Sequence, residues 1–189
     1  MKRTRIKLLK NANSSAFFIQ HLKYAIWFCS KKADETPDMI LKLSNLLDYL
    51  LYQTDKPFVS LTEEIHHIED YIALEKMRFN NTLNINFKTS TVSEALKIAP
   101  MLLLPFVENS FKHGVIKNGE LSINIDLRCD ENKIHLQIVN TASKAISSKS
   151  GIGLDNIKKR LDLLYLNQYE LKIDQTDDLF TVNLNLNLN

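Results

Sequence analysis

Residues 102–114, LLLPFVENSFKHG, combine large apolar side chains with three polar groups on about one turn of a helix. The spacing predicts a helix over Met101–His113 with one buried side. Asn109 and His113 stand four residues apart and therefore share a face. A carboxamide oxygen suits Mg2+, which completes its shell with water and phosphate oxygens, and Lys112 and His113 would balance phosphate charge. Spacing alone leaves open that Asn109 and His113 form hydrogen bonds to each other or to backbone groups near a helix end.

A second polar element is Gly151-Ile152-Gly153-Leu154, which stands before a predicted helix over Leu154–Tyr165. The unpaired amides and the dipole at a helix N-terminus form a site for anions such as phosphate. Glycines also open many helices for steric reasons, so the pattern by itself supports both interpretations.

The last nine residues, TVNLNLNLN, alternate between apolar and amide side chains, which predicts a strand with one buried and one wet face. Similar alternation predicts strands over 83–87, 121–127 and 134–139. Together with the two helices, these strands predict an α/β sandwich with helices on one face of a mixed sheet. The elements do not alternate regularly enough for a doubly wound parallel sheet.

The first half shows helical periodicity near 18–29, 36–51 and 60–79. The third stretch begins with the capping box Ser60-Leu61-Thr62-Glu63, in which Ser60 accepts from the third helical amide. Apolar stripes this wide predict pairing with another chain, as in a dimeric four-helix bundle. The sequence changes character near residues 80–81, so we expect a helical dimerisation region over 1–80 and an α/β domain over 81–189.

The composition, with 44% hydrophobic and 24% charged residues, is that of an ordinary globular protein. A formal net charge of +2 gives no electrostatic reason to expect a nucleic-acid or membrane partner. Cys29 and Cys129 stand apart from other metal ligands, so a reducing, cytoplasmic setting is expected without a disulfide framework or zinc site. The longest apolar run, 98–107, reaches about half of the roughly 20 residues that cross a bilayer, so no membrane span is expected.

Three motifs occur along the chain: VSLTEEIHHIEDYIALEKMRF at 59–79, LLLPFVENSFKHG at 102–114 and GIGLDNIKKRLDLLY at 151–165. They resemble the motifs of LytS-like sensor histidine kinases, whose catalytic domain has the GHKL ATPase fold. The resemblance implies a site for ATP and Mg2+ in which Asn109 is the Mg2+ ligand. It also implies phosphate contacts from Lys112, His113 and the amides of Gly151, Gly153 and Leu154.

The phosphoacceptor motif of this family falls on Ser14–Gln20, where Ala16 takes the position of the histidine. A methyl group has no lone pair with which to attack phosphorus, so we expect no autophosphorylation at that position. His66 and His67 belong to the third predicted helix and are interpreted as solvated surface residues, not as substitutes.

Residues 139–142 take the place of the Asp-x-Gly with which histidine kinases in general bind the adenine amino group. Asn140 keeps an acceptor oxygen, whereas Ala142 replaces the glycine that lets the base approach the backbone. Thr141–Ser150 is either a lid over the nucleotide or an ordinary polar loop. Pro105 stands where hydrolytic relatives carry a water-activating glutamate, which favours a kinase over a free-standing ATPase.

The sequence therefore predicts an α+β histidine-kinase core that binds ATP and Mg2+ and phosphorylates a histidine supplied in trans. The alternative is a non-catalytic pseudokinase that dimerises with, or regulates, a kinase or a response regulator. A third hypothesis is serine phosphorylation at Ser14 or Ser15, although such serines are common helix caps. The expected partners are a second copy or a related kinase, and a response regulator.

Overall fold

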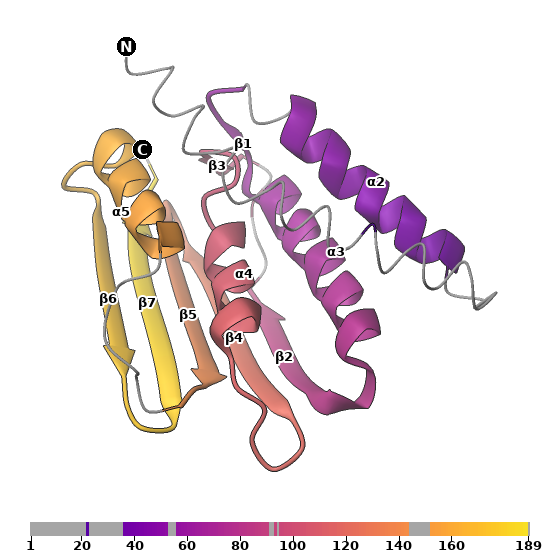
Figure 1. Cartoon of the computed structure of the whole chain (residues 1–189). Helices are drawn as coiled ribbons and strands as arrows, with labels where there is room; N and C mark the ends of the chain where they lie inside the picture. The colour runs from indigo at the N-terminus through magenta and orange to yellow at the C-terminus, as the bar shows by residue number, and fades with distance from the viewer. Residues whose placement is uncertain are drawn as a thin grey trace.

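The computed structural model describes residues 22, 36–52, 56–90, 93, 95–143 and 152–188, apart from the side chains of 50–52 and 152 (Figure 1). Position 16 and, except for Leu22, the helix predicted near 18–29 lie outside the described residues. No helix in the described part of the chain is long and apolar enough to span a bilayer. The elements, in chain order, are α2 (Thr36–Tyr52), β1 (Val59–Ser60), α3 (Leu61–Phe79), the 3-10 helix η2 (Asn80–Thr82), β2 (Leu83–Thr89), β3 (Lys97–Ile98), α4 (Leu104–His113), β4 (Leu121–Asp130), β5 (Lys133–Thr141), α5 (Ile152–Leu164), β6 (Tyr169–Gln175) and β7 (Leu179–Asn187).

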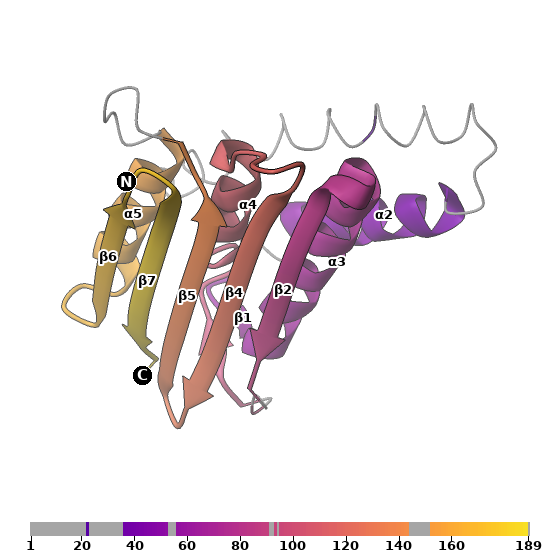
Figure 2. The same ribbon diagram turned by 90° about the horizontal axis from the view of Figure 1, so that it is seen from below.

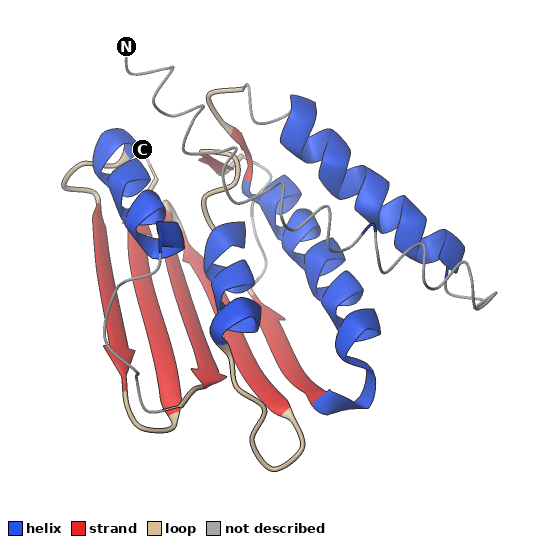
Figure 3. Cartoon of the chain, viewed as in Figure 1, coloured by secondary structure: helices blue, strands red, loops and turns tan. Residues whose placement is uncertain are grey.

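Five strands form one mixed sheet in the order β2-β4-β5-β7-β6. β2 runs parallel to β4, and the other neighbours are antiparallel. Figure 2 shows α3, α4 and α5 on the same side of the sheet, and Figure 3 separates the helical layer from the strand layer by colour. The α+β class and the prediction that helices cover one face of a mixed sheet are therefore confirmed.

The terminal strand β7 has the alternating character that its sequence predicts. Leu184 and Leu186 are buried on the helix-covered face, whereas Asn185 and Asn187 are exposed on the opposite face. There, the ring nitrogen Nδ1 of His135 lies 2.6 Å from Oδ1 of Asn185 on the neighbouring strand. Polar side chains thus pair across the strands of the open face, which needs no covering helix.

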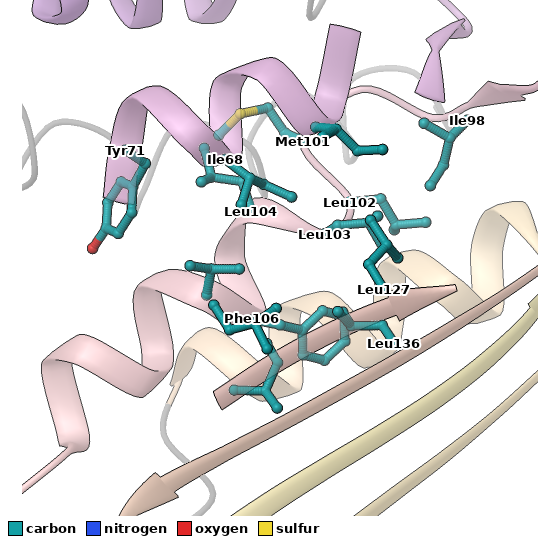
Figure 4. Packing of buried hydrophobic residues seen from close by; sticks show 14 of the residues in the cluster. Ile68, Tyr71, Ile98, Met101, Leu102, Leu103, Leu104, Phe106, Leu127 and Leu136 are labelled. Carbon is teal, nitrogen blue, oxygen red and sulfur yellow. The ribbon is translucent and has the colours of Figure 1, made fainter. Parts of the chain in front are cut away.

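The core lies between the sheet and the helices. Phe106 projects from α4 toward Leu127 of β4 and Leu136 of β5 (Figure 4). Phe106 keeps 1% of its surface exposed and the two leucines keep none. Leu104, at the start of α4, lies beside Ile68 of α3 in the same view. Because α4 is packed both on α3 and on the sheet, only part of its surface remains for polar side chains.

α3 is attached at its start to the half of the chain that carries the sheet. Glu63 N donates to Ser60 Oγ at 3.0 Å, which confirms the predicted serine cap. Leu61 N donates to Leu96 O at 2.8 Å, and β1 pairs with β3 in an antiparallel arrangement that the sequence did not predict. These contacts fix the first turn of α3 beside the segment that leads into α4.

The predicted boundary at residues 80–81 falls in η2, the short 3-10 helix between α3 and β2. Upstream of it, the Tyr71 ring of α3 meets the Phe111 ring of α4 edge to face, with ring centroids 5.5 Å apart. One cluster of buried hydrophobic residues extends from α2 through α3 and α4 to the sheet. Residues 80–81 therefore mark a change of secondary structure within a continuous core.

α4 begins at Leu104, three residues later than the sequence predicts, and this start is a correction. Met101 has a φ of 59°, in the left-handed region that an α-helix cannot contain. From Leu104 to His113 the predicted helix and the observed helix agree. Residues 99–103 instead form a non-helical segment that other helices hold in place.

Candidate functional site

The carboxyl-terminal end of α4 is fixed to the end of β5. Val115 N donates to Thr141 O at 2.9 Å, and Thr141 Oγ1 donates to Val115 O at 2.7 Å. α4 also packs on α5, and Figures 1 and 2 both show the two helices next to each other. α4 thus contacts both of the other elements that carry predicted site residues.

Gly114 is required at the end of α4 for steric reasons. A Cβ atom on this residue would lie 2.5 Å from Leu121 Cδ1 and 2.5 Å from Ser110 O. Gly114 N donates to that same Ser110 oxygen at 3.0 Å, so the backbone cannot move away without losing a hydrogen bond. The glycine therefore lets the chain leave α4 close against β4 and reach Thr141.

Asn140 lies on the helix-covered face of β5, two residues beyond the buried Ile138, and is 2% exposed. Its Nδ2 donates to Thr141 O at 3.0 Å. Its Oδ1 is buried and has no hydrogen-bond partner among the described residues. A buried acceptor left unpaired costs about 1–3 kcal/mol, so this oxygen suits a donor that a ligand supplies. The amino group of adenine is a donor of that kind, and Asn140 therefore fits a bound adenine.

The polar residues of α4 differ in exposure. Asn109 is partly buried, whereas Lys112 and His113 are exposed at the last turn. Among the described residues, no hydrogen bond joins the Asn109 carboxamide to the His113 imidazole. The structure therefore does not favour the alternative in which these two side chains bond to each other. Burial, and after it the charge of Lys112, lowers the pKa of His113. The lowered pKa favours the uncharged imidazole at neutral pH.

α5 begins at Ile152, so Gly153 and Leu154 lie in its first turn. Backbone amides in the first turn of a helix have no partner within the helix and remain available to an anion. The Leu154 side chain is 8% exposed and belongs to the hydrophobic core with Ile157. Leu154 can therefore offer a ligand only its amide, and Gly151 lies outside the described residues.

Glu108, next to Asn109, is a charged group that sequence reasoning did not single out. It is partly buried, and burial and then the nearby Glu75 raise its pKa to about 7, against the opposing effect of Lys112. Glu75 is itself 2% exposed and forms an ion pair with Arg78 on α3. The face of α4 toward α3 therefore carries a carboxyl group that stays protonated up to about neutral pH.

Replacing Glu108 with glutamine is expected to raise the free energy of unfolding by about 3 kcal/mol at pH 8 and to leave it unchanged near pH 4. The unfolded chain releases the Glu108 proton near pH 4.5, whereas the folded protein holds it up to about pH 7. The wild-type protein thus loses stability as the pH rises through this window, and the variant does not. Urea denaturation at pH 4, 6 and 8 measures the difference.

The matched control is Glu120→Gln, because Glu120 is exposed and its carboxylate accepts a hydrogen bond from the exposed Asn84 side chain. Its effect should be small at every pH. A Glu108→Gln difference of the same size at pH 4 and pH 8 would contradict the role of burial.

His66 and His67 have different environments. His66 is exposed beside Glu69, as predicted. His67 is not a solvated surface residue, which corrects the prediction: its ring stacks on Tyr49 of α2 with the centroids 3.7 Å apart. Burial lowers the pKa of His67 to about 4, and its Nδ1 is buried without a partner in the described part of the chain.

The sequence patterns did not predict that three further buried polar residues, Tyr49, Glu64 and Arg160, lie together. They meet at residues 99–104, although they are far apart in the sequence. One weak signal was present: Arg160 follows Ile157 by three residues and so stands on the apolar stripe of α5. A charged residue on such a stripe indicates a buried partner, but periodicity does not identify it.

Comparison with known proteins connects this chain to one family. Residues 4–83 match the family model described as histidine kinase. The sensor protein kinase HptS of Staphylococcus aureus (strain USA300) is 29% identical over 131 residues, which cover 69% of this chain and 24% of HptS. The chain therefore spans about a quarter of the length of the curated relatives it matches.

Solved structures show the same fold at low identity. The histidine kinase domain of the blue-light-activated kinase EL346 from Erythrobacter litoralis has a TM-score of 0.54 at 12% identity, covering 78% of this chain and 75% of that chain. The histidine kinase ThkA, in complex with the response regulator TrrA, has a TM-score of 0.51 at 12% identity, covering 100% of this chain and 64% of that chain.

The sheet and the helices that cover it have the fold of histidine kinase domains of the GHKL type. In sequence the chain is similar to sensor histidine kinases, as the three motifs indicate.

Proposed function

We propose that this chain is the kinase core of a LytS-like two-component sensor, which binds Mg-ATP and transfers the γ-phosphate to a histidine of another chain. Transfer is in trans because Ala16 occupies the phosphoacceptor position and cannot form a bond to phosphorus. Residues 1–80 serve as the helical dimerisation region, with a second copy or a related kinase as partner, and 81–189 as the nucleotide-binding domain. A response regulator receives the phosphate from the phosphorylated histidine.

The observation that carries this proposal is the buried, unpartnered Oδ1 of Asn140. A lone acceptor on the inner face of the sheet, beside the end of the helix that carries Asn109, suits a base with an exocyclic amino group. A base without an amino group at this position would leave Asn140 Oδ1 buried and unpaired. The site therefore favours bases that carry a donor there over bases that carry an acceptor.

The other groups have separate roles. Asn109 would hold Mg2+, and the ion would neutralise charge that develops on the phosphates. Lys112 supplies a positive charge from the protein, while His113, being neutral, acts as a hydrogen-bond partner. The first-turn amides of Gly153 and Leu154 bind phosphate oxygens at the start of α5.

Calorimetric titration with ATP in the presence and absence of Mg2+ tests the site. The expected result is micromolar to submillimolar binding that requires Mg2+, with a loss of at least about tenfold in Asn109→Ala. Asn124→Ala is the matched control, since Asn124 is an exposed amide on the open face of the sheet. No binding at millimolar ATP would contradict the kinase and leave the pseudokinase as the working function.

Titration with GTP isolates the contribution of Asn140. GTP has a carbonyl oxygen where ATP has the amino group, so the acceptor of Asn140 should favour ATP by at least about tenfold. Asn140→Ala should abolish most of this preference. Equal affinities for ATP and GTP in the wild-type protein would contradict the assigned adenine contact.

Radiolabel transfer separates a kinase from a pseudokinase once binding is established. Wild-type protein with labelled ATP should label a histidine-containing relative and not itself, whereas Ala16→His should label itself. Binding without transfer to either acceptor would favour the pseudokinase.

A further inference from the structure

Residues 99–103, which lead into α4, and Leu104, its first residue, are held by four side chains that we name the loop clamp: Tyr49, Glu64, Arg160 and Tyr165. These side chains come from α2, α3, α5 and the residue after α5. They are 1%, 0%, 6% and 4% exposed, respectively. The loop clamp lies outside the proposed nucleotide contacts, yet it surrounds the start of the helix that carries Asn109, Lys112 and His113.

Glu64 caps α4 from a distance. The N-cap residue of α4 is Leu103, whose side chain cannot accept a hydrogen bond. Glu64 Oε1 instead accepts from Leu103 N at 2.9 Å and from Leu104 N at 3.4 Å. A carboxylate at this position also interacts favourably with the helix dipole. The N-terminus of α4 is therefore stabilised by a residue of α3 in place of a local cap.

The backbone of Met101 is fixed at both of its polar atoms. Glu64 Oε2 accepts from Met101 N at 2.8 Å, and Arg160 Nη1 donates to Met101 O. Arg160 Nη2 donates to Pro100 O, and Tyr165 Oη accepts from Ala99 N at 2.8 Å. A left-handed φ of 59° at a non-glycine residue costs free energy and persists because the surroundings enforce it. The loop clamp supplies that enforcement.

Tyr49 connects α2 to this arrangement. Its hydroxyl donates to Glu64 Oε2, and Met101 N lies 3.2 Å from the same hydroxyl oxygen. Tyr49 belongs to the last turn of α2 and stacks on His67, so its ring cannot swing away without a movement of α2 or α3. The same carboxylate thus contacts α2 on one side and the start of α4 on the other.

We propose that Glu64 is the positioning residue of α4 and that the Tyr49 hydroxyl couples the placement of α2 to it. A shift of α2 would alter the contacts of Glu64 and thereby the position of Asn109 relative to the start of α5. Such coupling between sites is a free energy that acts in both directions. Its effect on nucleotide affinity rests on the proposed function, whereas the positioning of α4 does not.

Amide hydrogen exchange of the full chain without ligand tests the positioning. Glu64→Gln and Tyr49→Phe keep side-chain shape while removing the charge and the hydroxyl, respectively. Both are expected to speed exchange over Leu104–His113 by about tenfold and to leave β7 unchanged. The matched controls are Glu120→Gln and Tyr169→Phe, whose polar atoms contact groups away from the clamp.

Three outcomes would overturn the proposal. Unchanged exchange over α4 in Glu64→Gln would show that Glu64 does not position the helix. Unchanged exchange in Tyr49→Phe alone would remove the coupling to α2. An equal increase throughout the sheet would show a general loss of stability instead of a local effect.

Addition of Mg-ATP tests the coupling in the opposite direction. Binding to the wild-type protein should slow amide exchange in α2. In Tyr49→Phe, the factor by which Mg-ATP slows this exchange should be about tenfold smaller. If the wild-type protein binds Mg-ATP and α2 does not respond, the coupling is overturned. If the wild-type protein does not bind Mg-ATP, the proposed function fails, and the exchange of the free protein still decides whether Glu64 and Tyr49 position α4.

Discussion

Replacing Arg160 with methionine is expected to lower the free energy of unfolding by about 3–5 kcal/mol, because two buried backbone carbonyls lose hydrogen bonds from a charged donor. Arg160 is 6% exposed, and burial lowers the pKa of its guanidinium while the charge of Glu64 opposes this. Its Nη atoms donate to Pro100 O and Met101 O. The variant leaves both carbonyls without their donors and removes the positive charge that interacts electrostatically with Glu64.

Urea denaturation followed by circular dichroism measures this effect. Arg128→Met is the matched control, because Arg128 is an exposed residue on the open face of the sheet that pairs with Asp126. The control should behave as the wild-type protein does. If Arg160→Met loses less than about 1 kcal/mol, the guanidinium is not a structural partner of the residues before α4.

Phe106→Ala is expected to lower the free energy of unfolding by a similar amount, about 3–5 kcal/mol. The ring is 1% exposed and fills the space between α4 and the strands that carry Leu127 and Leu136 (Figure 4). Truncation to alanine removes apolar contact and leaves a cavity, since the sheet cannot collapse onto a smaller side chain.

The same denaturation measurement applies, with Phe58→Ala as control. Phe58 is 51% exposed, so its truncation should cost much less than that of Phe106. Equal losses for the two phenylalanines would contradict the assignment of Phe106 to the main core. A loss at Phe106 with unchanged Mg-ATP affinity would show that α4 keeps its position after the cavity forms.

The elements that the sequence predicted well are those whose local pattern and environment agree. β7 alternates because one of its faces lies beneath the helices, and α3 starts at Leu61, directly after its cap Ser60, because the cap and the periodicity coincide. β6, Tyr169–Gln175, was missed because it lies at the edge of the sheet and most of its side chains are exposed. An edge strand with little buried surface gives a weak alternation.

The candidate site was predictable only in part for a different reason. Helical spacing places Asn109 and His113 on one face of α4, and this requires no knowledge of the tertiary structure. The roles of Glu64 and Arg160 depend on contacts with Met101, which is 37 residues from one and 59 from the other. Contacts of that range are not visible in periodicity, so the late start of α4 and its distant cap could not be predicted.

β2 joins the sheet differently from the other strands. β4 and β5 are connected by a tight hairpin in which Asp130 faces Lys133, whereas Leu83 of β2 faces Leu121 only after the chain has passed through α4. Closing the longer loop costs more conformational entropy, so the β2–β4 pairing, like the β5–β7 pairing, should form after the β4–β5 hairpin during folding. Because β2 follows α3 almost directly, this edge of the sheet and α3 should join the hairpin, and separate from it, as one cooperative unit.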